Sequence, residues 1–383
     1  MSFALSPDQQ KYVVRVRALA ERELTADRFA GSAGGVDRPL LLELGRLGLL
    51  RGLFGGEQNA APRDAAAMQL CLLRETLAAV NSHAETALAL QGLGSYPILQ
   101  SGSEATIRRW VPGVVAGETV AAFALSESGA GSDAAGLELR AEPDGDGWRL
   151  YGEKTWISNA PEADVYSVFA RTTPDSRARG VTAFAVAGDA DGLSGQPIDL
   201  LAPHAIGTLT FDGVRVTRDD VLGEVDRGFA VAMRTLDLFR PSVGAFAVGM
   251  AQAALDAAVA YTGERLVHGA PLSRQQSVEH TLAEMATRTQ ASRLLVYAAA
   301  SAYDDGADAG HVTTSAAMAK LHATEAAQFV VDQAVQLHGA RALQHGHLLE
   351  HLYREVRAPR IYEGASEIQR TIIGRALTAR RDG

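Results

Sequence analysis

A change in the spacing of apolar residues in the middle of the chain constrains the fold more than any other feature. Between about residues 119 and 216, apolar residues fall in short runs bounded by turn residues, at 121–125, 136–141, 148–151, 165–171, 181–186 and 208–216. Such runs are typical of strands in a small antiparallel barrel or sandwich. Asp144-Gly145-Asp146-Gly147 predicts a hairpin turn between two strands, because glycine supplies the positive φ values that such turns need. We therefore expect a separate β-domain in this region.

Helical periodicity flanks the β-rich region on both sides. Ser6, Pro7 and Asp8 predict a helix start, with Ser6 as the capping residue and Pro7 at the first helical position. Apolar residues recur at helical spacing in further stretches, at 40–50, 65–80, 230–266, 277–304 and 313–338. Long helices joined by short turns favour an antiparallel bundle. The predicted fold class is α+β with three domains: an N-terminal helical domain over 1–118, a middle antiparallel β-barrel or sandwich over 119–226, and a C-terminal four-helix bundle over 227–383.

Composition narrows the class of protein further. The formal net charge is -9 and the Lys and Arg residues are scattered, which argues against a nucleic-acid partner. Cys71 is the only cysteine, so no internal disulfide can form and we expect a reducing compartment. The N-terminus has no basic segment followed by an apolar core, and no apolar run reaches the roughly 18 residues of a membrane span. We expect a cytoplasmic protein without a membrane span.

Near the C-terminus a carboxylate stands on a glycine turn just before a predicted helix. The stretch 361–370 reads IYEGASEIQR. Gly364 lets the backbone turn, and Ser366 with Gln369 has the spacing of a capping box, so we expect a helix to begin there. Partial removal from water would raise the pKa of the Glu363 carboxyl and make it a stronger base. A solvated loop acid fits this stretch equally well, so the segment alone leaves both interpretations open.

Four short motifs follow one another along the chain. They are SESGAGSD at 126–133, GEKTWISNA at 152–160, QLHG at 336–339 and YEG at 362–364. In order and spacing they resemble the acyl-CoA dehydrogenase family of flavoproteins over essentially the whole chain. The resemblance implies an oxidoreductase that acts on the CH–CH bond of an acyl thioester. It also implies FAD between the β-domain and the C-terminal bundle, reaching a neighbouring subunit of a homotetramer or homodimer.

The resemblance assigns cofactor contacts to particular residues. Small residues between Ser126 and Asp133 let backbone amides approach a planar ring closely. Trp156 offers the flavin a flat face and Ser158 offers a hydroxyl. The family segment matching 265–276 reaches the FAD pyrophosphate and adenosine of a partner subunit, where an arginine can bridge phosphate oxygens. The implied cofactor-binding residues are Phe123, Leu125, Ser126, Trp156, Ser158, Arg265, His268, Gln276, Gln336, Gly339 and Glu367.

The resemblance also implies the chemistry. Glu363 would take the α proton of the thioester while the β hydride passes to the flavin N5. The Glu363 backbone N–H and a ribityl hydroxyl of FAD would polarise the thioester carbonyl. Tyr96 aligns with the floor of the acyl pocket and would favour a short, branched or cyclic acyl group, although plain helix packing explains it equally well. The implied substrate-binding residues are Tyr96, Ser132, Asp237, Arg240 and Tyr362, of which Asp237 and Arg240 also fit an ordinary (i, i+3) ion pair.

Several positions depart from the family pattern. The flavin loop begins SES at 126–128 where the family has Thr-Glu-Pro, and Ala365 replaces a threonine that contacts the flavin. The lost hydrogen bond would weaken FAD binding by on the order of 1 kcal/mol. Residues 198–207 lack the family's usual basic connection near the CoA entrance, so the acyl group could arrive on an acyl-carrier protein instead of CoA. Electrons would leave to an acceptor such as an electron-transfer flavoprotein.

Two other classes of enzyme share this fold. Flavin-dependent monooxygenases or oxidases have no need of a base at Glu363, and a non-redox thioester lyase would keep FAD as a scaffold. Ser128 and Ala365 are compatible with the lyase. A metal site is a further hypothesis, but no nearby cysteine or acidic triad completes it, so we predict none. The histidines that suggest it are His338, His345, His347 and His351.

Overall fold

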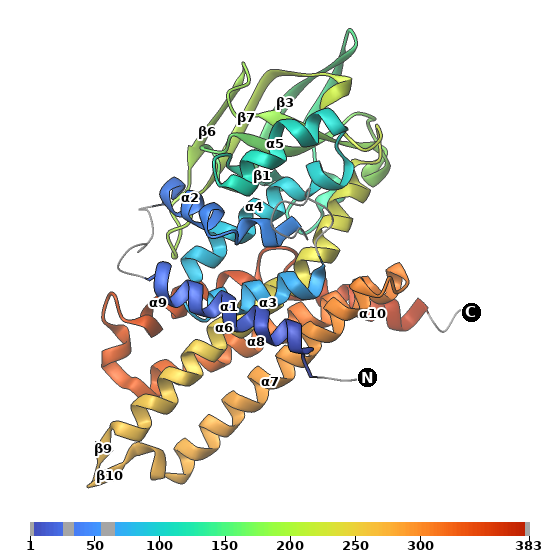
Figure 1. The fold of residues 1–383 in the computed structure, drawn as a ribbon. Coiled ribbons are helices and arrows are strands. Elements are labelled where there is room, and N and C mark those ends of the chain that lie inside the picture. The colour runs from blue at the N-terminus through green and yellow to red at the C-terminus, as the bar shows by residue number, and fades with distance from the viewer. Residues whose placement is uncertain (1–3, 26–33, 55–65, 380–383) are drawn as a thin grey trace. The chain divides into compact units, whose positions relative to one another are not determined.

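The chain forms two compact units (Figure 1). A computed structural model describes residues 4–25, 34–54 and 66–379. The helical unit comprises Met1–Arg28, Ala66–Glu85 and Asp237–Gly383, and the β-unit comprises Phe29–Ala65 and Thr86–Leu236. The chain passes from one unit to the other within two long helices, α4 (Ser82–Ser101) and α6 (Gly228–Glu264).

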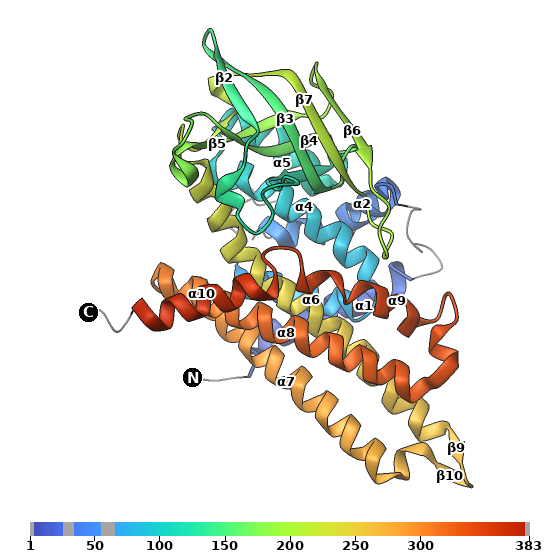
Figure 2. The ribbon, with the colours of Figure 1, turned by 180° about the vertical axis from the view of Figure 1, so that it is seen from behind.

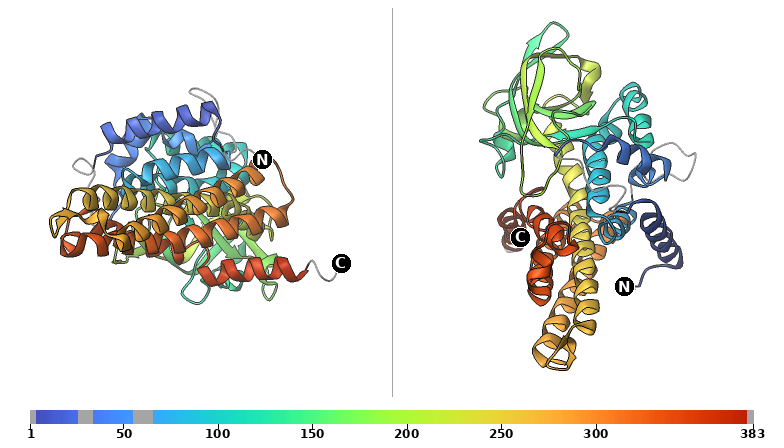
Figure 3. Two further views of the ribbon diagram at one scale, coloured as in Figure 1. Left: turned by 90° about the horizontal axis from the view of Figure 1, so that it is seen from below. Right: turned by 90° about the vertical axis from the view of Figure 1, so that its left-hand side faces the viewer.

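Long helices build the helical unit. Three of them, α6, α7 and α8, lie side by side (left panel of Figure 3). Gly244 of α6 allows the close approach, because a Cβ there would lie 2.7 Å from Val296 of α7 and 3.4 Å from Ala323 of α8. Besides its parts of α4 and α6, the described helices of this unit are α1 (Pro7–Glu23), α3 (Ala67–Ala78), α7 (Gln276–Asp304), α8 (Ala309–His338), α9 (Leu348–Glu355) and α10 (Ser366–Ala379).

Short polar residues start two of these helices. The Ser6 side chain accepts a hydrogen bond from the Gln9 backbone N–H and Gln9 returns one, which completes a capping box, with Pro7 at the first helical position. Asp308 starts α8 in a similar way, since its carboxylate accepts a hydrogen bond from the His311 N–H at 3.0 Å. The predicted helix start at Ser6 is therefore confirmed.

Helix α6 is the one described helix that is long and apolar enough to cross a membrane by length and composition. However, 72% of its most apolar window is buried inside the protein. A helix that is apolar on all sides is expected at the centre of a helical core. The apolar character of α6 therefore belongs to the core, and no membrane protein is indicated.

One mostly antiparallel sheet forms the centre of the β-unit (Figure 2). Within the described residues it has eight strands, seven of them in the order β6-β7-β3-β2-β4-β5-β8, while β1 pairs in parallel with β4. The expected antiparallel sheet in the middle of the chain is thus confirmed, with two parallel pairs, β1 with β4 and β2 with β4. The strands are β1 (Ala121–Ala124), β2 (Arg140–Asp144), β3 (Gly147–Ser158), β4 (Val165–Arg171), β5 (Val181–Ala187), β6 (Leu193–Pro197), β7 (Ile206–Val216) and β8 (Val221–Leu222).

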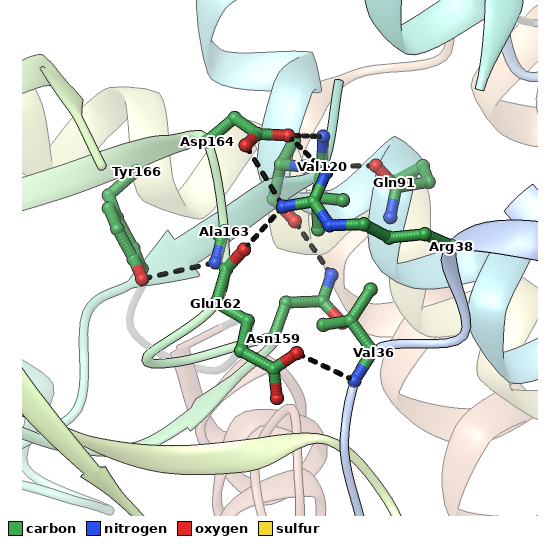
Figure 4. Close-up of polar contacts among 10 residues, drawn as sticks. Val36, Arg38, Gln91, Val120, Asn159, Glu162, Ala163, Asp164 and Tyr166 are labelled. Carbon is green, nitrogen blue, oxygen red and sulfur yellow. Dashed lines mark hydrogen bonds and ion pairs between the residues drawn. The ribbon is translucent and has the colours of Figure 1, made fainter. Parts of the chain in front are cut away.

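A polar network fixes the turn after β3 within the β-unit (Figure 4). Arg38, the first residue of α2 (Arg38–Arg46), donates to both carboxylate oxygens of Asp164, each at 2.9 Å. Asp164 also accepts from the Val120 N–H at 2.7 Å, and the Glu162 carbonyl accepts from Arg38 at 2.9 Å. Asn159 donates to a backbone carbonyl of β1 at 2.8 Å. These bonds hold the turn that follows Trp156 and Ser158 in one conformation.

Some of the expected element boundaries are wrong. A strand was expected over 136–141, but a short 3-10 helix (Ala134–Gly136) occupies its start and β2 begins only at Arg140. The reason is that the Glu127 carboxylate accepts the N–H groups of Glu138 and Leu139, which a strand would use for pairing.

The helix expected over 40–50 also differs, because α2 ends at Arg46, before Gly48, whose φ is +73°. Strand β6 was missed because its residues are largely exposed and form no apolar run. The domain boundaries at 118/119 and 226/227 stay a prediction.

Candidate active site

Glu363 and Gly364 form a sharp corner in the helical unit between Arg360 and α10. Their φ angles are +52° and +92°, so two consecutive residues are in the left-handed region. Glycine adopts this region freely, whereas a residue with a Cβ pays on the order of 1 kcal/mol. Backbone strain at a glutamate is a sign of a functional constraint.

Three side chains hold the backbone of this corner. Gln369 donates to the carbonyls of Glu363 and Gly364, at 3.2 and 2.8 Å. Arg240 of α6 donates from Nε to the Glu363 carbonyl at 3.3 Å, and Lys320 of α8 donates to the Gly364 carbonyl at 2.7 Å. The corner is therefore fixed by residues from two helices of the bundle and from the helix that follows it.

The capping box expected from Ser366 and Gln369 is wrong. Ser366 is the first helical residue of α10, and its hydroxyl donates to Glu325 of α8 at 2.6 Å. The side chain of Gln369 is used on the corner carbonyls instead. A charged acceptor 41 residues away competes better for the hydroxyl than the local backbone N–H does.

The Glu363 carboxyl has the surroundings of a general base. Its Oε2 atom is buried and has no hydrogen-bond partner among the described residues. Burial raises the pKa of the carboxyl, and the nearby charges of Arg74, Lys320 and Arg240 oppose that rise. A buried, unpartnered carboxylate oxygen whose pKa lies above its usual value can accept a proton from a bound ligand. The interpretation of Glu363 as a solvated loop acid does not fit this geometry.

Sequence reasoning missed a buried ion pair whose arginine lowers the pKa of this carboxyl. Arg74 of α3 donates from Nε to Glu85 of α4, and from Nη1 to the Ser242 hydroxyl at 2.7 Å. Arg74 is 3% exposed and Glu85 is fully buried. The only sequence signal was a single arginine inside the apolar run of α3.

The structure brings some of the predicted substrate-binding residues close to Glu363. Arg240 bonds its carbonyl and also pairs with Asp237, at 3.4 Å between Nη1 and Oδ1. Asp237 in turn accepts from the Thr313 hydroxyl at 3.0 Å, so the ion pair expected for these two residues exists. Tyr362 precedes Glu363 and has 37% of its surface exposed.

The predicted flavin-contacting residues lie in the β-unit. Lys154 of β3 is fully buried and donates to the Glu127 carboxylate at 2.7 Å and to the Leu125 carbonyl at 2.9 Å. The Thr155 N–H donates to the Ser126 carbonyl at 3.0 Å. The glycine-rich loop is therefore attached to β3 at its start.

Trp156 is presented on an irregular part of this strand. The pairing of β3 with β7 shifts between Lys154 and Ile157, and Trp156 between them has a φ of +63° with 54% of its surface exposed. A large exposed indole on strained backbone is unusual unless a ligand covers it. A Cβ added at Gly129 or Gly131 would meet no atom within 4 Å, so the loop is open toward a ligand. A flat aromatic face and accessible backbone amides fit the isoalloxazine of FAD.

The remaining residues predicted to line the ligand sites of the β-unit occupy varied environments. Phe123 packs against Phe169, with ring centroids 4.9 Å apart, and Leu125 is buried. Ser158 ends β3, Ser132 is exposed in the glycine-rich loop, and Tyr96 is buried within α4.

The residues predicted to reach a partner's FAD lie at ends of helices in the helical unit. Arg265 follows α6, and His268 has a φ of +51° in the short hairpin of β9 (Leu266–Val267) and β10 (Ala270–Pro271). The other members of this set are Gln276 at the start of α7, Gln336 and Gly339 at the end of α8, and the exposed Glu367 in α10.

The histidines have structural partners of their own. His338 stacks on Tyr261 at 4.2 Å between centroids, and His347 caps α9 by accepting the Leu349 N–H. His351 bonds the Ser82 hydroxyl at 2.6 Å. Among the described residues there is no group of three His, Cys, Asp or Glu side chains that could hold a metal ion.

Comparison with known proteins identifies the family. The family models of the N-terminal, middle and C-terminal domains of acyl-CoA dehydrogenase match residues 6–118, 122–214 and 226–378. A probable acyl-CoA dehydrogenase of Mycobacterium leprae is 36% identical, over 98% of this chain and 96% of its own length.

Two solved structures support the same family. Butyryl-CoA dehydrogenase from Megasphaera elsdenii has a TM-score of 0.91 and 33% identity, covering 99% of this chain and 100% of the other. The FAD complex of PigA has a TM-score of 0.92 and 25% identity, with the same coverage. These matches confirm the expected α+β fold and the expected class of oxidoreductase. The chain belongs to the acyl-CoA dehydrogenase family.

Proposed function

We propose that this protein is an FAD-dependent dehydrogenase of a short acyl thioester, with Glu363 as the base that removes the α proton. The single observation that carries the proposal is the Glu363 carboxyl, which has a buried, unpartnered oxygen on a strained corner held by three donors. A flavin-dependent oxygenase would not need such a base.

The chain's own residues account for the proton transfer. Burial raises the pKa of Glu363, so the ionised carboxylate is a stronger base than a solvated one. The positive charges of Arg74, Lys320 and Arg240 keep the carboxyl ionised often enough to act. The bonds to the Glu363 and Gly364 carbonyls keep the corner from moving when the proton arrives.

FAD, when bound, supplies the acceptor for the hydride that leaves the β carbon. In the β-unit we assign its ring to the region of Phe123, Leu125, Ser126, Trp156 and Ser158. The exposed indole of Trp156 and the open space around the glycine-rich loop support this assignment. Its pyrophosphate and adenosine are assigned to Arg265, His268, Gln276, Gln336, Gly339 and Glu367, partly across a subunit boundary, which makes the enzyme a homotetramer or homodimer.

We assign the substrate and the partners from the resemblance to the family and from the departure at residues 198–207. The acyl thioester is carried on CoA or on an acyl-carrier protein and contacts Tyr96, Ser132, Asp237, Arg240 and Tyr362. An electron-transfer flavoprotein or a similar acceptor reoxidises the flavin. One solved structure of the same fold, with a TM-score of 0.91 and 31% identity, is named as an electron transferring flavoprotein of Acidaminococcus fermentans. The enzyme works in the cytoplasm.

Anaerobic mixing of the purified flavoprotein with short, branched and cyclic acyl-CoA thioesters tests the proposal. The oxidised flavin absorbance should bleach with at least one of them, and Glu363→Gln should abolish bleaching while retaining FAD. Bleaching by carrier-bound acyl groups alone would identify the carrier. A flavin that stays oxidised with every CoA and carrier thioester refutes dehydrogenation.

A further inference from the structure

The ion pair beside the catalytic carboxyl has one oxygen that the protein leaves without a partner. Arg74 donates to Glu85 Oε1 and to the Ser242 hydroxyl, and its guanidinium lies 5.9 Å from the centre of the Phe246 ring. Glu85 Oε2, by contrast, is buried and has no hydrogen-bond partner among the described residues. The pair therefore presents an unused acceptor.

A purely structural role does not account for this arrangement. A buried ion pair contributes little to stability compared with apolar residues of similar size, because removing both charges from water is costly. A carboxylate oxygen left without a donor adds to that cost. A pair kept only to join α3 to α4 would be expected to satisfy both oxygens of Glu85.

Helix α6 links the pair to the corner that carries Glu363. Arg74 is the cation that most lowers the pKa of Glu363, and Glu85 also influences that of Arg74. The Ser242 hydroxyl, which accepts from Arg74, stands on α6 two residues from Arg240, which donates to the Glu363 carbonyl. Glu363 and Glu85 each have a buried oxygen without a hydrogen-bond partner among the described residues. The first oxygen receives the α proton in the proposed reaction.

We propose that Glu85 Oε2 accepts a hydrogen bond from a hydroxyl group on the acyl chain, so that the preferred substrate is a short hydroxyacyl thioester. The hydroxyl stands beyond the β carbon, because that carbon gives up the hydride. This inference rests on the proposed dehydrogenase function. It makes Glu85 a specificity-determining residue and Arg74 the residue that positions it.

Chemistry distinguishes the hydroxyl from the other ends that an acyl chain can carry. A methyl end would leave the buried Oε2 of Glu85 without water and without a hydrogen-bond donor. A carboxylate end would bring a fourth anion to a cluster that already holds Glu85, Glu355 and Glu363. A hydroxyl is neutral and donates one hydrogen bond, and a hydrogen-bond donor is what the ionised Glu85 Oε2 lacks. Burial raises the pKa of Glu85 to about 7, with Arg74 opposing the rise, so the carboxyl is mostly ionised at pH 8.

The test compares three CoA thioesters of equal chain length at pH 8: pentanoyl-CoA, 5-hydroxypentanoyl-CoA and glutaryl-CoA. The wild-type holoenzyme should use the hydroxyacyl substrate with a kcat/KM about 10- to 100-fold above that of pentanoyl-CoA, the usual range for a hydrogen bond to a charged group. Glutaryl-CoA should be the poorest of the three. A preference for pentanoyl-CoA or glutaryl-CoA overturns the proposal.

A double variant, Arg74→Met with Glu85→Leu, removes the pair without leaving a lone buried charge. The ratio of kcat/KM for the hydroxyacyl and pentanoyl substrates should fall to about 1. Any effect of the lost arginine on Glu363 applies to both substrates and cancels in the ratio. Arg288→Met with Glu284→Leu removes an exposed pair of α7 as a matched control and should keep the wild-type ratio. A double variant that keeps the hydroxyl preference refutes the role of Glu85.

Binding separates this inference from the proposed function. If no thioester is oxidised, dehydrogenation is wrong, and calorimetric titration of the same three thioesters then decides the question. Tighter binding of 5-hydroxypentanoyl-CoA to the wild type, lost in the Arg74→Met and Glu85→Leu double variant, would support the Glu85 subsite on its own. Equal affinities for the three would refute it.

Discussion

Replacement of Lys320 by methionine should make the protein more stable and the enzyme less active. Lys320 is fully buried, and its pKa falls from 10.5 to about 8, mainly because burial disfavours the charged form. At about 1.4 kcal/mol per pKa unit, that depression corresponds to about 3 kcal/mol against the ammonium at pH 7. Methionine has a similar length and carries no charge, so it removes this cost. The Gly364 carbonyl does not become unsatisfied, because Gln369 still donates to it at 2.8 Å.

Urea unfolding at pH 7 measures the first effect. Lys320→Met should raise the free energy of unfolding by up to about 3 kcal/mol. Lys11→Met is the matched control, because Lys11 is 78% exposed and its removal should change stability by less than about 0.5 kcal/mol. The linkage has a definite sign. The folded-state pKa of Lys320 is depressed, so the unfolded chain binds the extra proton between pH 8 and 10.5, and the wild type should gain stability with rising pH in that window.

Enzyme kinetics measure the second effect. Loss of the Lys320 charge removes one of the three cations that lower the pKa of Glu363, so the acidic limb of kcat/KM should move to higher pH. The corner also loses a donor, and kcat should fall. A variant less stable than the wild type by more than about 1 kcal/mol would contradict the burial argument. An unmoved acidic limb would contradict the electrostatic one.

Three further predictions concern the two sites. Glu127→Gln leaves the buried Lys154 without its counter-ion, so it should destabilise the protein by about 3 kcal/mol and lower the flavin content. Thermal unfolding and the absorbance of the purified protein measure the two effects, and unchanged stability would argue against a structural role of the Lys154–Glu127 pair. Trp156→Asn should leave the unfolding temperature of the apoprotein nearly unchanged, because asparagine tolerates a positive φ and the indole is exposed. FAD titration of this variant should show at least about tenfold weaker binding. Equal affinity of the variant and the wild type for FAD would show that Trp156 is not part of the flavin site. In the wild type, the acidic limb of the kcat/KM profile should have its midpoint above pH 4.5, since burial raises the pKa of Glu363 and only the ionised form is a base. A midpoint at or below pH 4.5 would point to another base.

The elements that sequence reasoning predicted well are those set by local chemistry. The start of α1 follows from Ser6 and Pro7, and the Asp144 to Gly147 turn joins β2 to β3 as expected. The corner at Glu363 was recognisable because a glycine beside a carboxylate indicates a special backbone conformation. Each of these signals lies within a few residues.

The features that sequence reasoning missed depend on distant partners. Ser366 bonds Glu325 in place of its own helix, and Glu127 takes the N–H groups that a strand would have used. The Arg74 and Glu85 pair joins two helices across 11 residues and has no motif. An arginine in an apolar helical run indicates only that some partner exists, and periodicity does not say which one.

Exchange of the α hydrogens of a bound thioester tests the central claim most directly. Butyryl-CoA incubated anaerobically in D₂O with the wild-type holoenzyme should lose its α-proton NMR signal as deuterium replaces hydrogen. The Glu363→Gln variant, with its FAD content matched, should leave that signal in place, because an amide cannot accept the proton. Exchange at the wild-type rate in the Glu363→Gln variant would contradict the assignment of Glu363 as the base.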